Sequence, residues 1–309
     1  MGNMNIKFNF MRMRVITTIM SVLLLIASIA SLSYQGLNLG IDFTGGTLVE
    51  VGYPEAVDLD KIRESFIDSE FSNTSVQYFG TANEILIRIP PQRGLNSADI
   101  SSNLLNLLSA NDLNVEMRRV EFVGPQVGDE LKEDGGLAML YALLCIMVYV
   151  AFRFQMRFSV GAVAALIHDV VITLGFFSIM HFNFDLTILA ALLAVIGYSL
   201  NDTIVVFDRV RENFRKIRDK TPVDVFNISL NQTLSRTLMT SFTTLLVLIA
   251  LFFLGGEIIH GFSIALIFGV LIGTYSSIYI ASPVTLALGI KKEDLMPVKK
   301  EGLDLENQP

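Results

Sequence analysis

Residues 186–213 read LTILAALLAVIGYSLNDTIVVFDRVREN, an apolar run that polar side chains interrupt near its middle. The part over 186–207 is long enough to cross the hydrocarbon core of a membrane, which takes about 20 helical residues. Ionisable residues at that depth cost at least ~2.5 kcal/mol each, so Asp202, and Asp208 at the end of the run, need a reason to be there. The stretch therefore predicts a membrane-spanning helix whose polar side chains serve a purpose.

The composition of the whole chain agrees with a membrane protein. Hydrophobic residues make up 52% and charged residues 17%, and the mean hydropathy is +0.54, which is too apolar for a soluble chain of this length. The net charge of -7 describes one region, because the acids are concentrated between residues 40 and 135. The single cysteine, Cys145, cannot form an intramolecular disulfide, and no Cys/His spacing indicates a metal site. We expect no cofactor and no nucleic-acid partner.

Five more apolar runs recur along the chain, near residues 15–34, 136–152, 159–180, 237–254 and 262–284. We therefore predict a polytopic α-helical membrane protein with six transmembrane helices and an α+β domain inserted after the first. The predicted order is an N-terminal segment (1–14), the first transmembrane helix (15–35), the α+β domain (36–135), helices two to four (136–208), an amphipathic loop (209–236), helices five and six (237–284) and a tail (285–309).

The orientation follows from lysine and arginine in the segments that flank the spans. The N-terminus, the turn with Arg153 and Arg157, the segment 209–220 and the tail are basic, whereas the loops 181–185 and 255–261 carry neither lysine nor arginine. Basic flanks stay in the cytoplasm. Both termini are therefore predicted to be cytoplasmic, and the α+β domain to be outside.

Six short elements are predicted within that domain from the spacing of its apolar residues. They are a strand at 47–53, a helix at 59–66, strands at 75–79 and 84–89, a helix at 100–108 and a strand at 115–123. This βαββαβ order matches the ferredoxin-like split βαβ motif. Gly135 and Gly136 are predicted to mark the return to the membrane.

The polar segment 208–235 carries spaced apolar residues and allows two interpretations. It forms short amphipathic helices on the membrane surface, split at Thr221-Pro222, or it is a solvated basic loop.

Helical geometry divides the polar residues of the fourth span between two faces. At about 100° per residue, Gly197, Asn201 and Asp208 share one face, and Asp202 points away from it. A small residue, an amide and a carboxylate are thus predicted to line one side of the helix.

The fifth span offers a partner for a carboxylate. Arg236 opens a polar stripe there that continues through Thr240, Thr243 and Thr244. An ion pair of Asp208 with Arg236 would lower the cost of both charges and respond to protonation. Asp169, beside His168 in the third span, is a further candidate. The plainer alternatives are an interfacial carboxylate for Asp208, and helix–helix hydrogen bonds for Asp202 and Asp169.

A second unusual string, LGIDFTGGT at residues 39–47, joins the first span to the outside domain. It lacks the Gly-Lys-Ser/Thr ending of a phosphate-binding loop and leads into a strand, so it does not indicate nucleotide binding. Gly40, Asp42, Gly45 and Gly46 predict a rigid turn between helix and sheet. Together with Gly197 they are candidate motif or hinge positions.

Three stretches resemble motifs of the SecD/SecF family, a part of the resistance-nodulation-division superfamily. Residues 39–47 resemble the motif that follows the first helix, residues 197–213 the fourth-helix signature of the SecF branch, and residues 231–237 the entry into the fifth helix. The resemblance covers the chain from the first span to about residue 292.

The resemblance implies a non-enzymatic half-transporter of the bacterial inner membrane. Such a subunit pairs with SecD in a twelve-helix unit, joins the SecYEG channel, with YajC and YidC as further partners, and assists late steps in the translocation of unfolded secretory proteins. The proton-motive force drives it, so protons are the coupling ion. The carboxylate placed like Asp208 and the arginine placed like Arg236 are implicated in proton passage, and Asp202 ranks below Asp208.

Three other functions are compatible with the helix plan. One is half of a proton-driven small-molecule or lipid exporter, whose relatives usually carry two six-helix repeats in one chain. Another is an intramembrane aspartyl protease, which needs two facing carboxylates such as Asp169 and Asp202. The third is a structural insertase scaffold, if the charges of Asp208 and Arg236 are dispensable.

Overall fold

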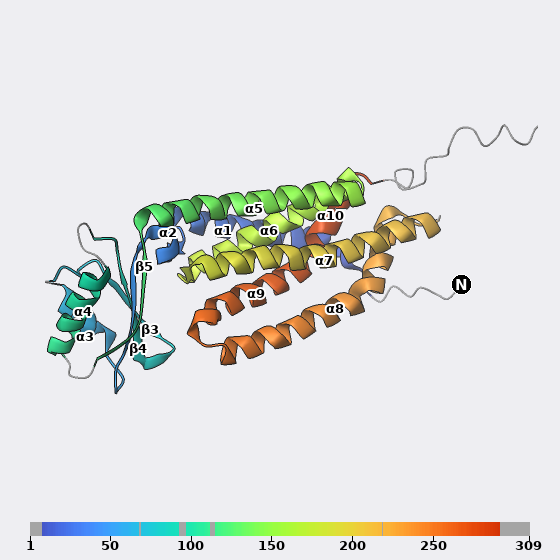
Figure 1. The fold of residues 1–309 in the computed structure, drawn as a ribbon. Helices are drawn as coiled ribbons and strands as arrows, with labels where there is room; N and C mark the ends of the chain where they lie inside the picture. The colour runs from blue at the N-terminus through green and yellow to red at the C-terminus, as the bar shows by residue number, and fades with distance from the viewer. Residues whose placement is uncertain (1–7, 68, 93–96, 112–114, 218, 291–309) are drawn as a thin grey trace, which may run out of the picture.

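The computed structural model describes residues 8–290 except residues 68, 93–96, 112–114 and 218. Predictions for residues 1–7 and for the tail beyond 290 lie outside that range. A bundle of long helices makes up most of the structure, and a small sheet domain is attached to one end of it (Figure 1).

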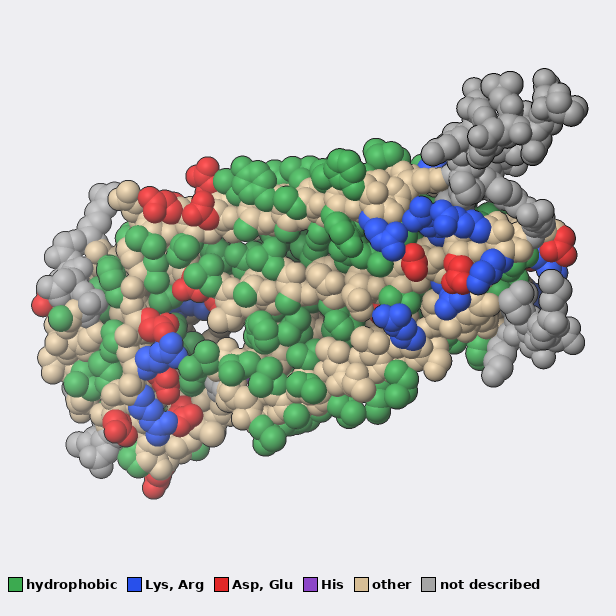
Figure 2. All heavy atoms as spheres, turned by 45° about the vertical axis from the view of Figure 1, so that its right-hand side comes forward, with side chains coloured by type: hydrophobic (Ala, Val, Ile, Leu, Met, Phe, Trp, Pro, Cys, Tyr) green, Lys and Arg blue, Asp and Glu red, His purple; other side chains and the backbone are tan. Residues whose placement is uncertain are grey.

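The bundle contains, within the described residues, six helical segments that are long and apolar enough to cross a membrane. They are α1 (Arg14–Tyr34), α5 (Pro125–Arg153), α6 (Met156–Ile179), α7 (Leu186–Lys216), α8 (Pro222–Leu254), and α9 (Glu257–Ser276) continued by the π-helix η2 (Ser277–Ala281) and α10 (Ser282–Ala287). A short 3-10 helix, η1 (Phe10–Arg12), precedes α1. Lysine and arginine side chains gather at the end of the bundle away from the domain, and hydrophobic side chains cover its middle (Figure 2). The prediction of a polytopic helical membrane protein is confirmed.

The predicted return to the membrane at Gly135 and Gly136 lies inside a long helix. Gly135 and Gly136 do not interrupt α5, which begins ten residues earlier at Pro125. A Cβ on Gly135 would lie 2.8 Å from Leu189 Cδ2, so this glycine permits close packing of α5 on α7. Glycine in a helix interior costs about 1 kcal/mol relative to alanine. At Gly135 the close contact between α5 and α7 offsets this cost.

The segment predicted as an amphipathic loop at 209–236 consists largely of the ends of two spanning helices. Helix α7 runs to Lys216, and α8 begins at Pro222 behind a capping box of Thr221 and Asp224. The apolar side chains Phe214 and Phe226 are buried and pack edge to face. The amphipathic pattern therefore reflects packing within the bundle, and only the helix start at Thr221-Pro222 matches the prediction.

The domain is a four-stranded antiparallel sheet with two helices on one face. Its elements are β2 (Gly46–Gly52), α3 (Leu59–Phe66), β3 (Ser75–Phe79), β4 (Thr81–Ile89), α4 (Ser97–Asn111) and β5 (Glu116–Val123), and the strand order is β3-β4-β2-β5. The sheet lies between its two helices and the bundle (Figure 1). Residues 81–83, predicted to connect two strands, belong to β4, because the hairpin turns at Gly80, whose φ is +75°.

The core of the domain explains why these segments fold together. Alternate residues of the central strands, such as Val49, Ile85 and Ile87, are fully buried, and Ile62 and Leu104 cover them from the helices. Alternation in the strands and helical spacing in the covering segments direct these apolar side chains into one core.

A two-stranded parallel pair, which was not predicted, joins the domain to the bundle. It consists of β1 (Asn38–Leu39) and β6 (Asn183–Phe184), and Gly40 N donates to Phe184 O at 2.7 Å. The short helix α2 (Ile41–Thr44) follows β1, and Asp42 Oδ2 accepts a hydrogen bond from Leu186 N, the start of α7, at 3.0 Å. The string at residues 39–47 thus fastens the first span to the beginning of the fourth.

Arg88 of β4 extends this junction into the sheet. Its guanidinium donates to Leu39 O at 3.1 Å and to Asn38 Oδ1 at 3.4 Å. Burial lowers the pKa of Arg88, and the carboxylates of Asp185 and Asp42 oppose that shift. An arginine stays protonated in spite of such a shift, so the junction keeps a cation between two carboxylates.

The two consecutive glycines of the junction are required by backbone conformation and space. Gly45 has a φ of +70° and Gly46 a φ of +126°. A Cβ on Gly46 would lie 2.5 Å from Ile89 O, and one on Gly45 would lie 2.8 Å from Pro125 Cα. Other residues rarely adopt such φ values, so these positions are specific for glycine.

We expect Gly46→Ala to destabilise the purified chain by about 1–3 kcal/mol, because alanine adds strain and a backbone clash. This loss is measured by thermal unfolding in detergent, with proteolysis of the domain as the signal for unfolding. Gly124→Ala is the matched control: Gly124 has a φ of -65° and no atom within 4 Å of its Cβ position. Equal losses in the two variants would contradict the role assigned to Gly46.

The domain core supplies a second prediction. Residues 45–124 expressed alone should unfold cooperatively in urea, and Ile87→Ala should lower the free energy of unfolding by about 2–5 kcal/mol, the usual cost of such a cavity. Ile67, which is 65% exposed, provides the control, since Ile67→Ala should cost less than about 0.5 kcal/mol. A gradual transition without a baseline would show that the domain depends on the bundle for its fold.

Candidate functional site

A buried carboxylate holds three helices of the bundle together. Asp169 of α6 is 1% exposed, and its Oδ2 accepts hydrogen bonds from Ser199 Oγ of α7 at 2.6 Å and from Ser276 Oγ of α9 at 2.7 Å. Its Oδ1 lies 3.0 Å from His168 Nδ1. Both oxygens therefore have partners, as a carboxylate removed from water requires.

The same cluster reaches a fourth helix through an aromatic ring. Tyr275 of α9 stacks on His168, with ring centroids 6.2 Å apart. Its hydroxyl lies 2.8 Å from Ser21 Oγ and donates to Thr17 O at 2.9 Å, both on α1. The ring nitrogen His168 Nε2 is buried and has no hydrogen-bond partner among the described residues. The Asp169 cluster, defined as His168, Asp169, Ser199, Tyr275 and Ser276, thus links α1, α6, α7 and α9.

Helix α9 is shaped to reach this cluster. A Cβ on Gly273 would lie 2.9 Å from Ser199 Cβ, so glycine lets α9 approach α7 closely here. The π-helix begins at Ser277, directly after the donor Ser276. Such wide turns are frequent at functional sites because they interrupt the regular hydrogen-bond ladder.

Asp202 is a second buried carboxylate, and it is less completely paired. It lies on α7, is 2% exposed, and its Oδ2 has no hydrogen-bond partner among the described residues. Its electrostatic partner is the cation of Arg236 on α8. The buried hydroxyls of Thr203 and of Thr237 also lack partners within the part of the chain that the structure describes. Helices α7 and α8 therefore carry a buried carboxylate oxygen and two buried hydroxyls that make no hydrogen bond within the described residues.

The predicted pairing of Asp208 with Arg236 is wrong. Asp208 Oδ1 lies 3.3 Å from a guanidinium nitrogen of Arg153, the last residue of α5, and the two side chains are 58% and 47% exposed. Arg236 instead acts on Asp202. The spacing along α7 correctly separates Asp202 from Asp208, but it does not show which of the two faces α8.

The face of α7 that carries Gly197, Asn201 and Asp208 is exposed in this chain. No atom of the described residues lies within 4 Å of the Cβ position of Gly197. Arg236 and Thr243 of α8 are likewise exposed, and the Thr243 hydroxyl donates to the carbonyls of its own helix, at 2.9 and 3.0 Å. The polar stripe of α8 therefore lies on an outer surface of the bundle.

The hydroxyl donors of the Asp169 cluster were not predicted from the sequence. Ser199, Ser276 and Tyr275 were not predicted as site residues, although Ser199 stands within the polar string of the fourth span and Tyr275-Ser276-Ser277 is a polar triplet in an apolar helix. Such hydroxyls in a span are a usable signal, because they need a partner that lipid does not provide.

Comparison with known proteins identifies relatives over almost the whole chain. Residues 103–291 match the family described as "Protein export membrane protein SecD/SecF, C-terminal", and residues 31–53 match the "SecD/SecF GG Motif". The protein translocase subunit SecF of Vibrio alginolyticus is 52% identical over 303 residues, covering 97% of this chain and 96% of that protein. The corresponding subunit of Escherichia coli O157:H7 is 47% identical over 301 residues, covering 96% and 93%.

Solved structures show the same relationship. The crystal structure of SecDF, a translocon-associated membrane protein from Thermus thermophilus, matches with a TM-score of 0.84 and 37% identity over 93% of this chain. SecDF in a super-membrane-facing form matches with a TM-score of 0.68 and 38% identity. This chain spans 39% and 38% of those two SecDF chains. The chain belongs to the SecD/SecF family of protein export membrane proteins.

Proposed function

We propose that this chain acts as a SecF-type subunit of the bacterial Sec protein-export machinery, and that Asp202 with Arg236 couples proton movement to late steps of translocation. The observation that carries the proposal is the buried Asp202 carboxylate, one oxygen of which has no hydrogen bond within the described structure, and which has an arginine of the neighbouring helix as its electrostatic partner. The subunit itself is proposed to be non-enzymatic, with protons as its coupling ion.

Three carboxylates were candidates for proton coupling, and their surroundings separate their roles. Asp169 has partners on both oxygens and is proposed to position the helices. Asp208 is exposed and paired with Arg153, so a change in its charge is screened by solvent and matters little to helix packing. Of the three, Asp202 is the one that combines burial with an oxygen unpaired in the described part of the chain. The ionised form of Asp202 is stabilised by the Arg236 cation, whereas its neutral form needs no cation.

A second membrane subunit is proposed to cover the exposed polar surface of α7 and α8. Gly197, Asn201, Arg236 and Thr243 are exposed in this chain, although such residues rarely face lipid. A SecD-type partner is the proposed cover, because the SecDF chains extend well beyond the part that matches this one. SecYEG, YajC and YidC are proposed further partners, and unfolded secretory proteins the cargo.

The outside domain is proposed to be ferredoxin-like. Its βαββαβ order, its antiparallel strand order β3-β4-β2-β5 and the position of both helices on one face support that class. The domain is proposed to face the periplasm, and both termini the cytoplasm, because lysine and arginine gather at the opposite end of the bundle (Figure 2).

Reporter fusions test the orientation. A reporter that is active only after export should be active when fused after Gly80 in the domain and inactive when fused after Lys220, between α7 and α8. The reverse pattern would overturn the orientation, and it would leave the family assignment intact.

Conservative substitutions test the coupling residue. Asp202→Asn keeps the size of the side chain but cannot titrate, so membrane vesicles that carry it should export at the rate of uncoupled wild-type vesicles. Arg236→Lys keeps the charge without the planar guanidinium and should retain part of the response to the proton gradient. Asp208→Asn is the control, and its vesicles should respond to the gradient like the wild type. A full response in Asp202→Asn vesicles would exclude Asp202 as the coupling residue.

A further inference from the structure

An apolar pocket with one basic residue lies where the domain meets the bundle. Its volume is about 340 Å³, within the usual size range of small-molecule sites. It is lined by Leu32, Leu37, Leu39, Phe43, Lys132, Gly135, Gly136, Met139, Phe184 and Leu189. The walls therefore come from α1, α2, α5, α7 and the strand pair β1–β6, which are the elements of the junction.

The pocket lies at the level where the spanning helices leave the apolar layer. Leu32 stands near the end of α1, and Met139 stands where α5 changes from the charged stretch 129–134 to an apolar run. Leu189 belongs to the first turn of α7. A lipid at this boundary can place its acyl chain against the apolar lining while its head group remains in the interface.

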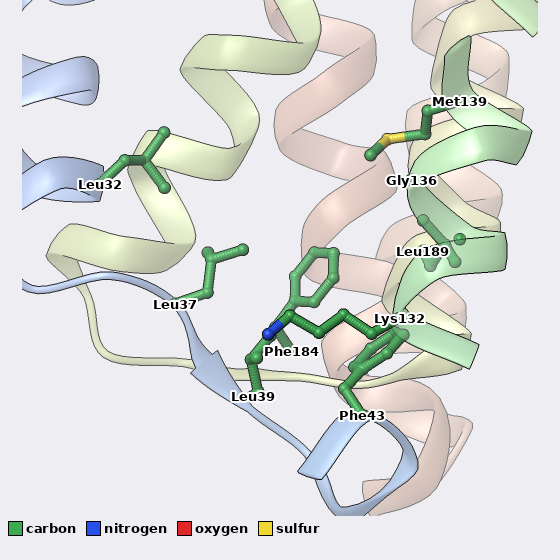
Figure 3. A pocket seen from close by; sticks show the side chains of 10 residues that line it. Leu32, Leu37, Leu39, Phe43, Lys132, Gly136, Met139, Phe184 and Leu189 are labelled. Atoms are coloured by element: carbon green, nitrogen blue, oxygen red, sulfur yellow. The ribbon is translucent and has the colours of Figure 1, made fainter. Parts of the chain in front are cut away.

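Lys132 supplies the charge of the pocket. Lys132, Gly136 and Met139 lie at i, i+4 and i+7 on one face of α5, and Figure 3 shows the Lys132 side chain crossing toward Leu39 and Phe184. No carboxylate forms an ion pair with Lys132 among the described residues. Glu133 and Asp134 are turned away by about 100° and 200° around the helix, and Asp129, three residues earlier and about 60° away, forms no ion pair with Lys132 in the described structure. Within the described residues the Lys132 ammonium therefore faces the pocket without a carboxylate partner (Figure 3).

We propose that this pocket binds one acyl chain of a phospholipid, whose phosphate pairs with Lys132. Lys132 is exposed, so an apolar protein side chain in the pocket would leave its ammonium with water alone, whereas a phospholipid supplies both an apolar chain and an anion. The proposed orientation of the chain would place this lipid in the outer leaflet, whereas the pocket and its charge do not depend on that orientation. A bound lipid would contact α2, β1 and β6 together, and would stabilise the junction between domain and bundle.

Photo-crosslinking of the full chain tests the site. The chain is reconstituted in vesicles of phosphatidylethanolamine and phosphatidylglycerol, with a minor share of phosphatidylethanolamine that carries a diazirine in one acyl chain. Peptide mapping should show labels on Leu37, Leu39 and Met139 in excess of those on Val148, a position of α5 that is 51% exposed and does not line the pocket. The excess should saturate as the labelled lipid increases, whereas labelling of Val148 should rise linearly.

Two variants and a matched control distinguish a specific site from general lipid contact. Lys132→Gln should lower the apparent affinity about fivefold, the effect of one lysine near a charged membrane surface. Gly136→Leu should abolish the excess labelling, because open space surrounds the Cβ position of Gly136 and a leucine would enter the pocket. Glu133→Gln removes a neighbouring charge on another face of α5 and should leave the excess labelling and the apparent affinity unchanged. Labelling of the pocket that equals that of Val148, or that neither Lys132→Gln nor Gly136→Leu reduces, would overturn the proposal.

Discussion

The carboxylate of Asp169 accepts hydrogen bonds from Ser199 and Ser276, and this contact fixes α6, α7 and α9 against one another. Water does not reach the apolar layer of a membrane, so a carboxylate there needs donors from the protein itself. Gly273 allows the close approach of α9 that brings Ser276 to the acid. The arrangement of the bundle, and with it the position of the other polar residues, depends on this contact.

Asp202 stands three residues beyond Ser199 on the same helix, but its surroundings differ. Asp169 is fully paired within the cluster, whereas Asp202 has Arg236 of α8 as its electrostatic partner and, among the described residues, one oxygen without a hydrogen bond. In the proposed mechanism the Asp169 cluster keeps α6, α7 and α9 as one unit, while a change of charge at Asp202 alters the contact with α8. The beginning of α7 is held by Asp42, and β6 precedes it, so in the proposed mechanism a displacement of α7 would reach the sheet domain through the junction.

The elements that depend on local pattern could be predicted from the sequence, and the contacts between distant segments could not. The spans follow from long apolar runs, and the domain elements near 47–53 and 59–66 from alternation and helical spacing. The β1–β6 pair could not be predicted because each strand has only two residues, too few to show an alternation of apolar and polar side chains. The pairing of Asp208 was wrong because the end of α5 lies beside α7 only in the folded bundle, and Arg153 is nearly sixty residues away in the chain. The hydroxyls of Ser199 and Ser276 carried a signal, but the acid that they bind lies on another helix.

Asp202, and neither Asp169 nor Asp208, is the carboxyl group proposed to gain and lose a proton in the bundle. Infrared difference spectroscopy of the purified chain between two pH values detects this directly through the carbonyl stretch of a protonated carboxyl group in an apolar environment. We expect a band that titrates with pH, disappears in Asp202→Asn, and remains in Asp169→Asn and Asp208→Asn. A band that survives Asp202→Asn unchanged would contradict it.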